Sequence, residues 1–220
     1  MPRRRYRRRS GSLSYLLVAV LVLGVGYLLV DRGVLPSPTS PTTTRGSPRG
    51  ESAAENRAAI RRLGGSIDYG RVDPDTGQRS GVRATITPAM VAAAERDQLG
   101  STADQDIRPP GYDRLPARNR ARGHLLGRQL GGSGAVAANL VALYQTRANS
   151  PVMRDYESAV AEAVQAGETV RYTVRPLYPG RTHNGAPSAI RITAGGDRGF
   201  RLDVTVANTP EAAVKEIAVP

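Results

Sequence analysis

Length, composition and charge narrow the class of protein. The chain has 220 residues, no cysteine and only two histidines, which excludes a disulfide framework and leaves almost no room for a four-ligand zinc site. Its net charge is +12, and six arginines within residues 1–9 supply half of that charge. The rest of the chain is still mildly basic, which favours a polyanionic partner such as nucleic acid.

The first 51 residues predict a membrane anchor followed by a linker. Residues 1–9 form a basic tail, and residues 10–30 contain no charged side chain and are rich in leucine and valine. A helix of about 20 apolar residues spans a bilayer, so residues 10–30 predict a single transmembrane helix. The arginines before it predict a cytoplasmic N-terminus and an extracellular body. Residues 31–51 are rich in proline, serine and threonine and predict an extended linker.

Secretion after signal cleavage is the alternative to a membrane anchor. A cleaved signal peptide normally has an apolar region of about 7 to 15 residues and a small-residue cleavage site. Residues 10–30 are longer than that, and no Ala-x-Ala sequence follows them. The sequence therefore favours the anchor.

Residues 52–220 predict one α+β domain, a mostly antiparallel sheet with one main helix across it. In the first half we expect a helix over residues 52–63, strands over 67–72 and 82–86, and a helix over 89–96 that is capped by Thr87 and opened by Pro88. Residues 98–116 predict an irregular surface loop. A short apolar strand then ends at His124, and a glycine-rich loop over residues 127–134 follows it.

The second half adds the main helix and most of the sheet. After a strand over residues 140–143, Ser150 and Pro151 predict a cap and first turn for a helix over 151–166, which Gly167 ends. Alternating apolar residues predict a strand over 169–177 and a hairpin formed by 188–194 and 200–207. The segment after Thr209 predicts a short helix.

His124 is the first candidate catalytic residue. An imidazole has an ordinary pKa of about 6.5, so the neutral ring can accept a proton from water near pH 7. A histidine that only makes structural hydrogen bonds at a strand end is the alternative.

Asn149 is the candidate metal ligand. It directly precedes the main helix, and packing of that helix end against the strand of His124 would bring the Asn149 amide oxygen into the same pocket. Oxygen ligands and retained waters suit Mg²⁺, with Mn²⁺ as a possible substitute. The ion would neutralise charge on the phosphate while His124 activates water, and the nearby Arg122 and Arg128 could hold the phosphate.

Three further residues lie near this pair in the sequence. Glu157 lies about two helical turns after Asn149 and could orient a metal-bound water or face solvent as an ordinary helix glutamate. Asn139 precedes a strand and is expected to fix loop geometry, and Gln129 is a substrate-binding or structural candidate. A Walker phosphate loop is rejected because Ser133 stands where its lysine is required.

The central stretch resembles the DNA/RNA non-specific endonuclease family, whose site is of the ββα-metal (His-Me finger) type. The residues that carry the resemblance are Arg122-Gly123-His124, residues 125–134, Asn139-Leu140-Val141, Asn149 and Glu157. The resemblance implies a ββα-metal nuclease core. It also implies that His124 is the general base, Asn149 the magnesium ligand, Glu157 a supporting acid and Asn139 a structural residue of the site.

The leading hypothesis is therefore a membrane-tethered, outward-facing, magnesium-dependent nuclease that cuts DNA and RNA without sequence preference. A non-catalytic surface protein for DNA binding or uptake is the second reading, and it would be favoured by loss of His124 or Asn149, both of which are present. A secreted nuclease toxin is the third, and it would require an inhibitor or immunity protein as a partner.

Overall fold

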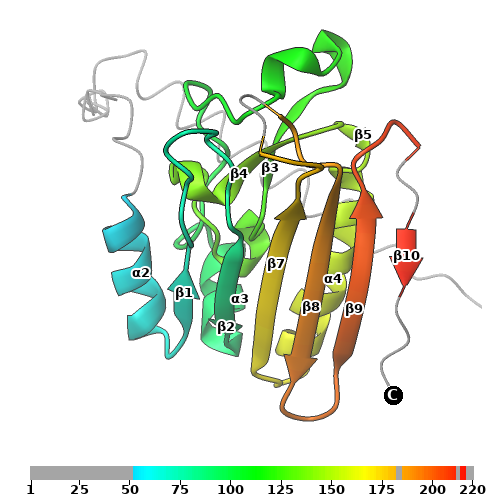
Figure 1. Ribbon diagram of the computed structural model, residues 1–220. Helices are drawn as coiled ribbons and strands as arrows, with labels where there is room; N and C mark the ends of the chain where they lie inside the picture. The colour runs from blue at the N-terminus through cyan, green and yellow to red at the C-terminus, as the bar shows by residue number, and fades with distance from the viewer. Residues whose placement is uncertain (1–51, 182–184, 212–213, 217–220) are drawn as a thin grey trace, which may run out of the picture. The chain divides into compact units, whose positions relative to one another are not determined.

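A six-stranded antiparallel sheet is the largest element of the computed structural model, which describes residues 52–181, 185–211 and 214–216 (Figure 1). The strand order is β1-β2-β7-β8-β9-β10, and each strand runs antiparallel to its neighbour. The strands are β1 (Ser66–Asp68), β2 (Val82–Ile86), β7 (Val170–Leu177), β8 (Ala189–Gly196), β9 (Arg201–Ala207) and β10 (Val214–Glu216).

Alternation of apolar and polar residues gives the sheet two different faces. In β7 the side chains of Val170, Tyr172 and Val174 are buried, whereas Arg171 and Arg175 point to solvent. The same alternation occurs in β2 and β8. Since successive side chains of a strand point to opposite faces, the apolar residues gather on one inner face. The core of the domain forms there.

Helices α3 (Pro88–Glu95) and α4 (Val152–Gln165) lie behind the sheet in Figure 1, where they cover its inner face and pack against each other. Thr87 caps α3, and its hydroxyl accepts a hydrogen bond from the Met90 amide. Helix α2 (Ala53–Arg62) begins at a capping box between Ser52 and Glu55 and packs beside β1. The caps of α2 and α3 agree with the helices predicted from the sequence. Helix α4 was expected to be the one main helix across the sheet, but it shares the inner face with α3.

A second, smaller hairpin carries the candidate site. Strands β3 (Ala121–His124) and β4 (Leu140–Leu143) pair antiparallel, with His124 opposite Leu140. Two-residue strands β5 (Thr146–Arg147) and β6 (Ser150–Pro151) pair in parallel just before α4. The hairpin and α4 form a ββα unit.

The prediction of Ser150 as the helix cap was wrong. Ser150 and Pro151 form β6, Pro151 occupies the cap position and makes no side-chain cap bond, and the helix begins at Val152. The Met153 amide donates instead to the Ala148 carbonyl, at 3.1 Å. A backbone acceptor therefore replaces the serine hydroxyl.

Two other predicted elements differ from the structure. Strand β1 ends at Asp68 because Gly70, with φ of 57°, turns the chain and donates its amide to the Asp68 carboxylate; only Val72 pairs again, with Arg79. The predicted helix after Thr209 is instead strand β10. A short isolated helix is only marginally stable, whereas pairing with the edge of β9 satisfies the backbone hydrogen-bonding groups of this segment.

The predicted basic tail (1–9), membrane segment (10–30) and linker (31–51) lie outside the described residues, so their boundaries stay predictions. In the part of the chain that the structure covers, no helix combines the length and apolar content that crossing a bilayer requires.

Candidate active site

His124 ends strand β3, and its ring is held in one orientation by a backbone carbonyl. The Nε2 atom lies 3.1 Å from the Ser101 carbonyl oxygen. A carbonyl oxygen can only accept, so Nε2 carries the hydrogen and Nδ1 of the neutral ring keeps its lone pair. The ring is thereby prepared to accept a proton at Nδ1.

The Ser101 carbonyl is in place because its segment is bonded to the glycine-rich loop after β3. The Ser101 amide donates to the Gly132 carbonyl, the Gly134 amide donates to the Ser101 hydroxyl, and the Asp104 amide donates to the Gly134 carbonyl. Gly134 permits this close approach, since a Cβ there would be 2.0 Å from the Thr102 carbonyl oxygen, and Gly132 lets the loop fold on itself, since a Cβ there would be 1.8 Å from the Leu126 carbonyl oxygen. The predicted role of the glycines in a tight turn agrees with this geometry.

The surroundings of His124 keep the imidazole neutral. Burial lowers its pKa below the usual value of 6.5, and the nearby Arg128 guanidinium lowers it further, while the bond to Ser101 acts in the opposite direction. The free base therefore predominates at pH 7.

Asn149 lies beside the same strand, as expected from the packing of the α4 end. Its Oδ1 atom would be 3.0 Å from a Cβ built on Gly123, so the missing side chain there lets Asn149 approach β3. Its Nδ2 atom donates to Gln145 Oε1 at 3.1 Å. This bond distinguishes the two amide atoms and leaves Oδ1 as the available ligand oxygen.

Glu157 lies on the buried face of α4 and not on its solvent face. Its side chain is 8% exposed. Burial raises the pKa of this carboxyl from 4.5 to about 8, although hydrogen bonds from the Gly127 backbone and the Gln129 side chain partly oppose the shift. Among the described residues, no lysine or arginine forms an ion pair with Glu157.

These side chains line one cavity of about 290 Å³ between β3, the segment before α4 and α4 itself. Four of the predicted site residues reach its wall: His124, Arg128, Asn149 and Glu157. The complete lining is His124, Gly127, Arg128, Gln145, Asn149, Ser150, Met153, Arg154 and Glu157.

Asn139 lies beneath the cavity and not in its wall. It is fully buried, its Oδ1 accepts from the Leu126 amide at 2.9 Å, and its Nδ2 donates to the carbonyls of Leu126 and Ser133 at 3.0 Å each. These bonds close the loop that follows His124. The geometry is that of a structural asparagine.

Arg122 points away from the cavity. Its guanidinium donates to the carbonyls of Ile107 and Gln105, to the Gln105 side chain and to the Tyr112 hydroxyl, at 2.6 to 2.9 Å. It also lies 4.3 Å from the centre of the Tyr112 ring. Arg122 thus binds the loop before β3 to the strand that carries His124.

The sequence reasoning did not single out two polar residues of the cavity, Gln145 and Arg154. Arg154 precedes Glu157 by three residues on a predicted helix, and such residues share a face, so helical spacing could have found it. Gln145 lies four residues before Asn149 and orients the Asn149 amide by accepting its hydrogen bond across the β5–β6 turn. No local pattern indicates that contact.

The donor atoms in this cavity suit a hard divalent cation. The described residues contain no group of three or more histidine, cysteine, aspartate or glutamate side chains that could enclose a metal. They do place the Asn149 amide oxygen and the buried Glu157 carboxyl, which has no cationic partner among them, in one cavity with room for water, and a cation bound there would favour the ionised form of Glu157. Mg²⁺ commonly uses few protein oxygens and retains several waters, so the donor set fits that ion.

Comparisons with known proteins identify the family of the chain and its fold. A family model described as DNA/RNA non-specific endonuclease matches residues 68–196, which includes the ββα unit and most of the sheet. No curated protein sequence matches the chain.

Solved nuclease structures share the fold. NucA from Streptococcus agalactiae with a magnesium ion bound is 20% identical, with a TM-score of 0.54 over 70% of this chain and 80% of NucA. The Sda1 nuclease with a bound zinc ion is 19% identical, with a TM-score of 0.52 over 66% of this chain and 75% of Sda1. At these identities the likeness concerns the fold.

Proposed function

The chain belongs to the DNA/RNA non-specific endonuclease family and is an endonuclease, and from that premise we propose that it hydrolyses phosphodiester bonds of DNA and RNA with one Mg²⁺ and without sequence preference. The observation that carries the proposal is the shared cavity of a neutral His124, the Asn149 amide oxygen and the buried Glu157 carboxyl.

His124 is the general base of this mechanism. Its Nε2 hydrogen is engaged by the Ser101 carbonyl, so Nδ1 takes the proton from the attacking water. The hydrogen bond at Nε2 holds the ring in place as it becomes an imidazolium, because the carbonyl oxygen stabilises the developing positive charge.

Asn149 would hold Mg²⁺ through its amide oxygen, and Glu157 would lie beside the ion in the same cavity. When bound, such an ion would supply positive charge that stabilises negative charge on the phosphate and the leaving oxygen. NucA with magnesium and Sda1 with zinc support a divalent ion in this fold, and Mn²⁺ could substitute. Gln129 supports the Glu157 carboxyl, and its Nε2 atom lies 3.5 Å from Ser158 Oγ.

Substrate selectivity follows from the wall of the cavity. Arg128 and Arg154 supply positive charge for the phosphate. Among the described residues that line the cavity, none has an aromatic side chain that could stack on a base. Contacts to phosphate carry no sequence information, which agrees with cleavage of both DNA and RNA. Arg122, in turn, fixes the loop before β3 and so positions His124; direct contact of Arg122 with phosphate stays a prediction.

The setting of the enzyme also belongs to the proposal. A single-pass anchor at residues 10–30 would hold the nuclease outside the cell, where it cannot cut the cell's own nucleic acid; secretion after cleavage is the alternative. An inhibitor or immunity protein stays a predicted partner. The DNA-binding or uptake reading would require an inactive site, but His124 and Asn149 share the cavity wall.

The test uses the full-length chain with supercoiled plasmid and total RNA, each in Mg²⁺ and in chelator. We expect loss of both substrates in Mg²⁺ only. His124→Ala should abolish the loss, and the control Arg61→Gln, an exposed substitution on α2, should not. Binding of plasmid without cleavage under every metal tried would favour the DNA-binding protein instead.

A further inference from the structure

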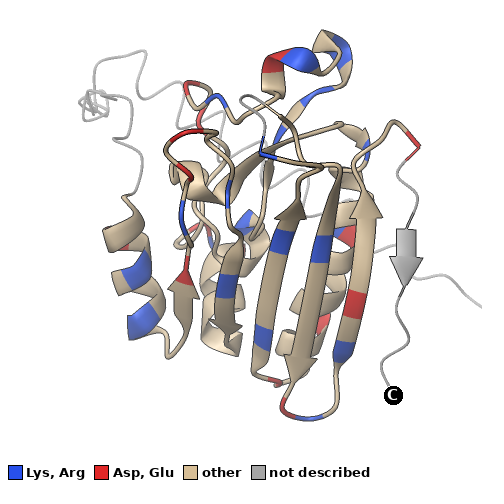
Figure 2. Cartoon of the chain, viewed as in Figure 1, with Lys and Arg blue, Asp and Glu red and all other residues tan. Residues whose placement is uncertain are grey.

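The outward face of the sheet, opposite α3 and α4, is basic and uncovered in the described part of the chain. We call the outward-facing side chains of β1, β2, β7, β8 and β9 the outer face. Figure 2 shows Lys and Arg in blue on β2, β7, β8 and β9, and acidic residues in red on β1 and β9. The charged residues of the outer face are the arginines Arg83, Arg171, Arg175, Arg191 and Arg201 and the aspartates Asp68 and Asp203.

The register places positive charges next to one another. Arg175 on β7 lies directly opposite Arg191 on β8. Arg83 on β2 pairs with Thr173 and is therefore the diagonal neighbour of Arg175. Like charges in such positions reduce the stability of a sheet. A binding role would explain why three neighbouring strands accept this cost.

The two aspartates compensate only the flanks of the outer face. Asp203 binds Arg191 through two hydrogen bonds of 2.9 and 3.1 Å, and Asp68 lies 4.0 Å from Arg83. In the described residues, no acidic side chain pairs with Arg171 or Arg175. The centre of the outer face on β7 therefore keeps its positive charge.

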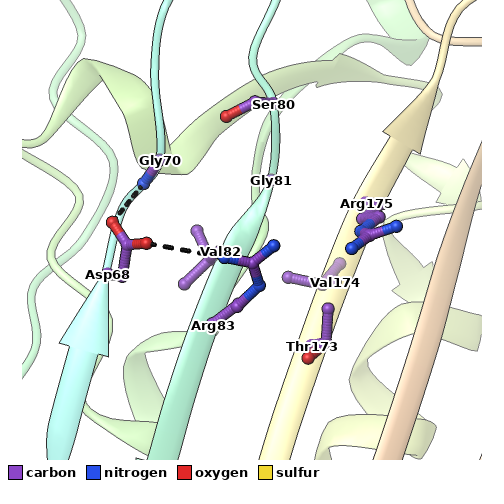
Figure 3. Close-up of a pocket in the computed structure, with 9 residues that line it drawn as sticks. All are labelled: Asp68, Gly70, Ser80, Gly81, Val82, Arg83, Thr173, Val174 and Arg175. Carbon is purple, nitrogen blue, oxygen red and sulfur yellow. Dashed lines mark hydrogen bonds and ion pairs between the residues drawn. The ribbon is translucent and has the colours of Figure 1, made fainter.

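A polar hollow lies between the arginines of β2 and β7 (Figure 3). Its volume is about 250 Å³, and its polar wall consists of Arg83, Arg175, Thr173, Ser80 and Asp68, whose carboxylate lies 4.0 Å from Arg83. Gly81, with φ of 116°, has no side chain to fill the space beside β7; a Cβ there would be 2.4 Å from the Val174 carbonyl oxygen. The Arg175 guanidinium, which has no acidic partner among the described residues, and the hydroxyl donors of the hollow suit a phosphate group, and Asp68 offsets only the charge of Arg83.

The outer face has little to offer an apolar partner. Among the described residues, Val72 and Leu177 are the large apolar side chains with high exposure, and only Leu177 belongs to the outer face. Protein interfaces typically require buried aromatic or aliphatic anchors. Positive charge with polar groups and few apolar anchors is instead typical of surfaces that contact a phosphate backbone.

We propose that the outer face is a second nucleic-acid-binding surface, which holds a distant segment of a long DNA or RNA while the α4 side of the same domain cuts. This inference rests on the proposed function. The cavity of His124 is lined by α4, which lies on the inner side of the sheet, whereas the outer face lies on the other side, so a few nucleotides cannot contact both. The surface acts only on long polymers.

The test compares the full-length variant Arg83→Gln/Arg171→Gln/Arg175→Gln with the control Arg61→Gln/Arg62→Gln/Arg96→Gln. The control removes the same number of positive charges from exposed positions at α2 and α3. Affinity for a 500-nucleotide single strand is measured in chelator with His124→Ala added to both, so no cleavage occurs. We expect the outer-face variant to bind about tenfold more weakly than the control. The slope of log affinity against log salt concentration should fall in magnitude by about 2, since each lost phosphate contact on a single strand removes about 0.7.

Cleavage provides the second measurement. In variants that retain His124, the ratio of kcat/KM for long RNA to that for a hexanucleotide should fall about tenfold in the outer-face variant, and the control should keep the ratio of the wild type. Equal affinity and equal ratios in the two variants would overturn the inference. The inference would also be overturned if the outer-face variant lost its binding to phosphatidylglycerol vesicles but kept its binding to nucleic acid. The outer face would then be a surface that binds a membrane. Failure of the wild type to cut any substrate would overturn the proposed function but leave the binding result interpretable.

Discussion

The carboxylate of Glu157 on α4 lies directly against the backbone of Gly127 in the loop after β3. A Cβ at position 127 would be 2.2 Å from Oε2 and 2.5 Å from the carboxyl carbon of Glu157. The glycine thus creates the space in which a buried carboxylate reaches the cavity of His124. Both residues line that cavity.

Gly127→Ala should therefore damage activity more than stability. The methyl group must displace the Glu157 carboxylate, and displacement of a site group by about 1 Å can cost about a hundredfold in rate. We expect kcat to fall by about that factor in a plasmid cleavage assay. Gly180→Ala is the matched control, because a Cβ there would meet no atom within 4 Å. Wild-type activity in Gly127→Ala would show that the position of Glu157 is unimportant.

Glu157 should also make the metal-free protein less stable as pH rises. The pKa of its carboxyl is about 8 in the folded state, above the ordinary 4.5, so the folded state binds the proton more tightly. The stabilisation is complete below pH 4.5 and is lost as pH rises to about 8, in total a few kcal/mol at about 1.4 kcal/mol per pH unit. Urea unfolding in chelator at pH 5 and pH 8.5 measures the loss.

Glu157→Gln is the comparison for that experiment, because the amide is uncharged and nearly the same size. We expect the variant to unfold at a higher urea concentration than wild type at pH 8.5. Equal stability of the two proteins at pH 8.5, together with equal dependence on pH, would contradict the prediction.

The two asparagines of the site should behave differently when each is replaced by alanine. Asn139→Ala leaves three buried backbone groups without partners, at about 1–3 kcal/mol each, so we expect a loss of several kcal/mol in unfolding free energy. Asn149 is only partly buried, and its side-chain amide donates to Gln145 at the protein surface. Asn149→Ala should unfold close to wild type but lose Mg²⁺ binding in calorimetry. A large loss of stability in Asn149→Ala would contradict its assignment as a ligand.

Local signals predicted the elements, and long-range packing decided the details of the site. Thr87 and Pro88 correctly predicted the start of α3, and alternation predicted β7, because caps and periodicity act within a few residues. Glu157 was ambiguous because its burial depends on Gly127, thirty residues away. The partner of His124, the Ser101 carbonyl, belongs to a loop that carries no periodic signal. Ser150 matched a local cap signal, but the turn of β5 and β6 supplied a backbone acceptor instead.

His124 should set the acid limit of activity, and Arg128 should control where that limit lies. The base must be neutral, so kcat/KM in saturating Mg²⁺ should fall as pH drops through the pKa of His124, which burial and Arg128 place below 6.5. Arg128→Gln removes a cation that disfavours the imidazolium, so the pKa of His124 rises and the acid limit moves to higher pH. The pH profile of plasmid cleavage measures this limit independently of any general loss of rate, and Arg61→Gln, an exposed change on α2, provides the control. A limit that stays fixed or moves to lower pH in Arg128→Gln would show that His124 is not the group that titrates.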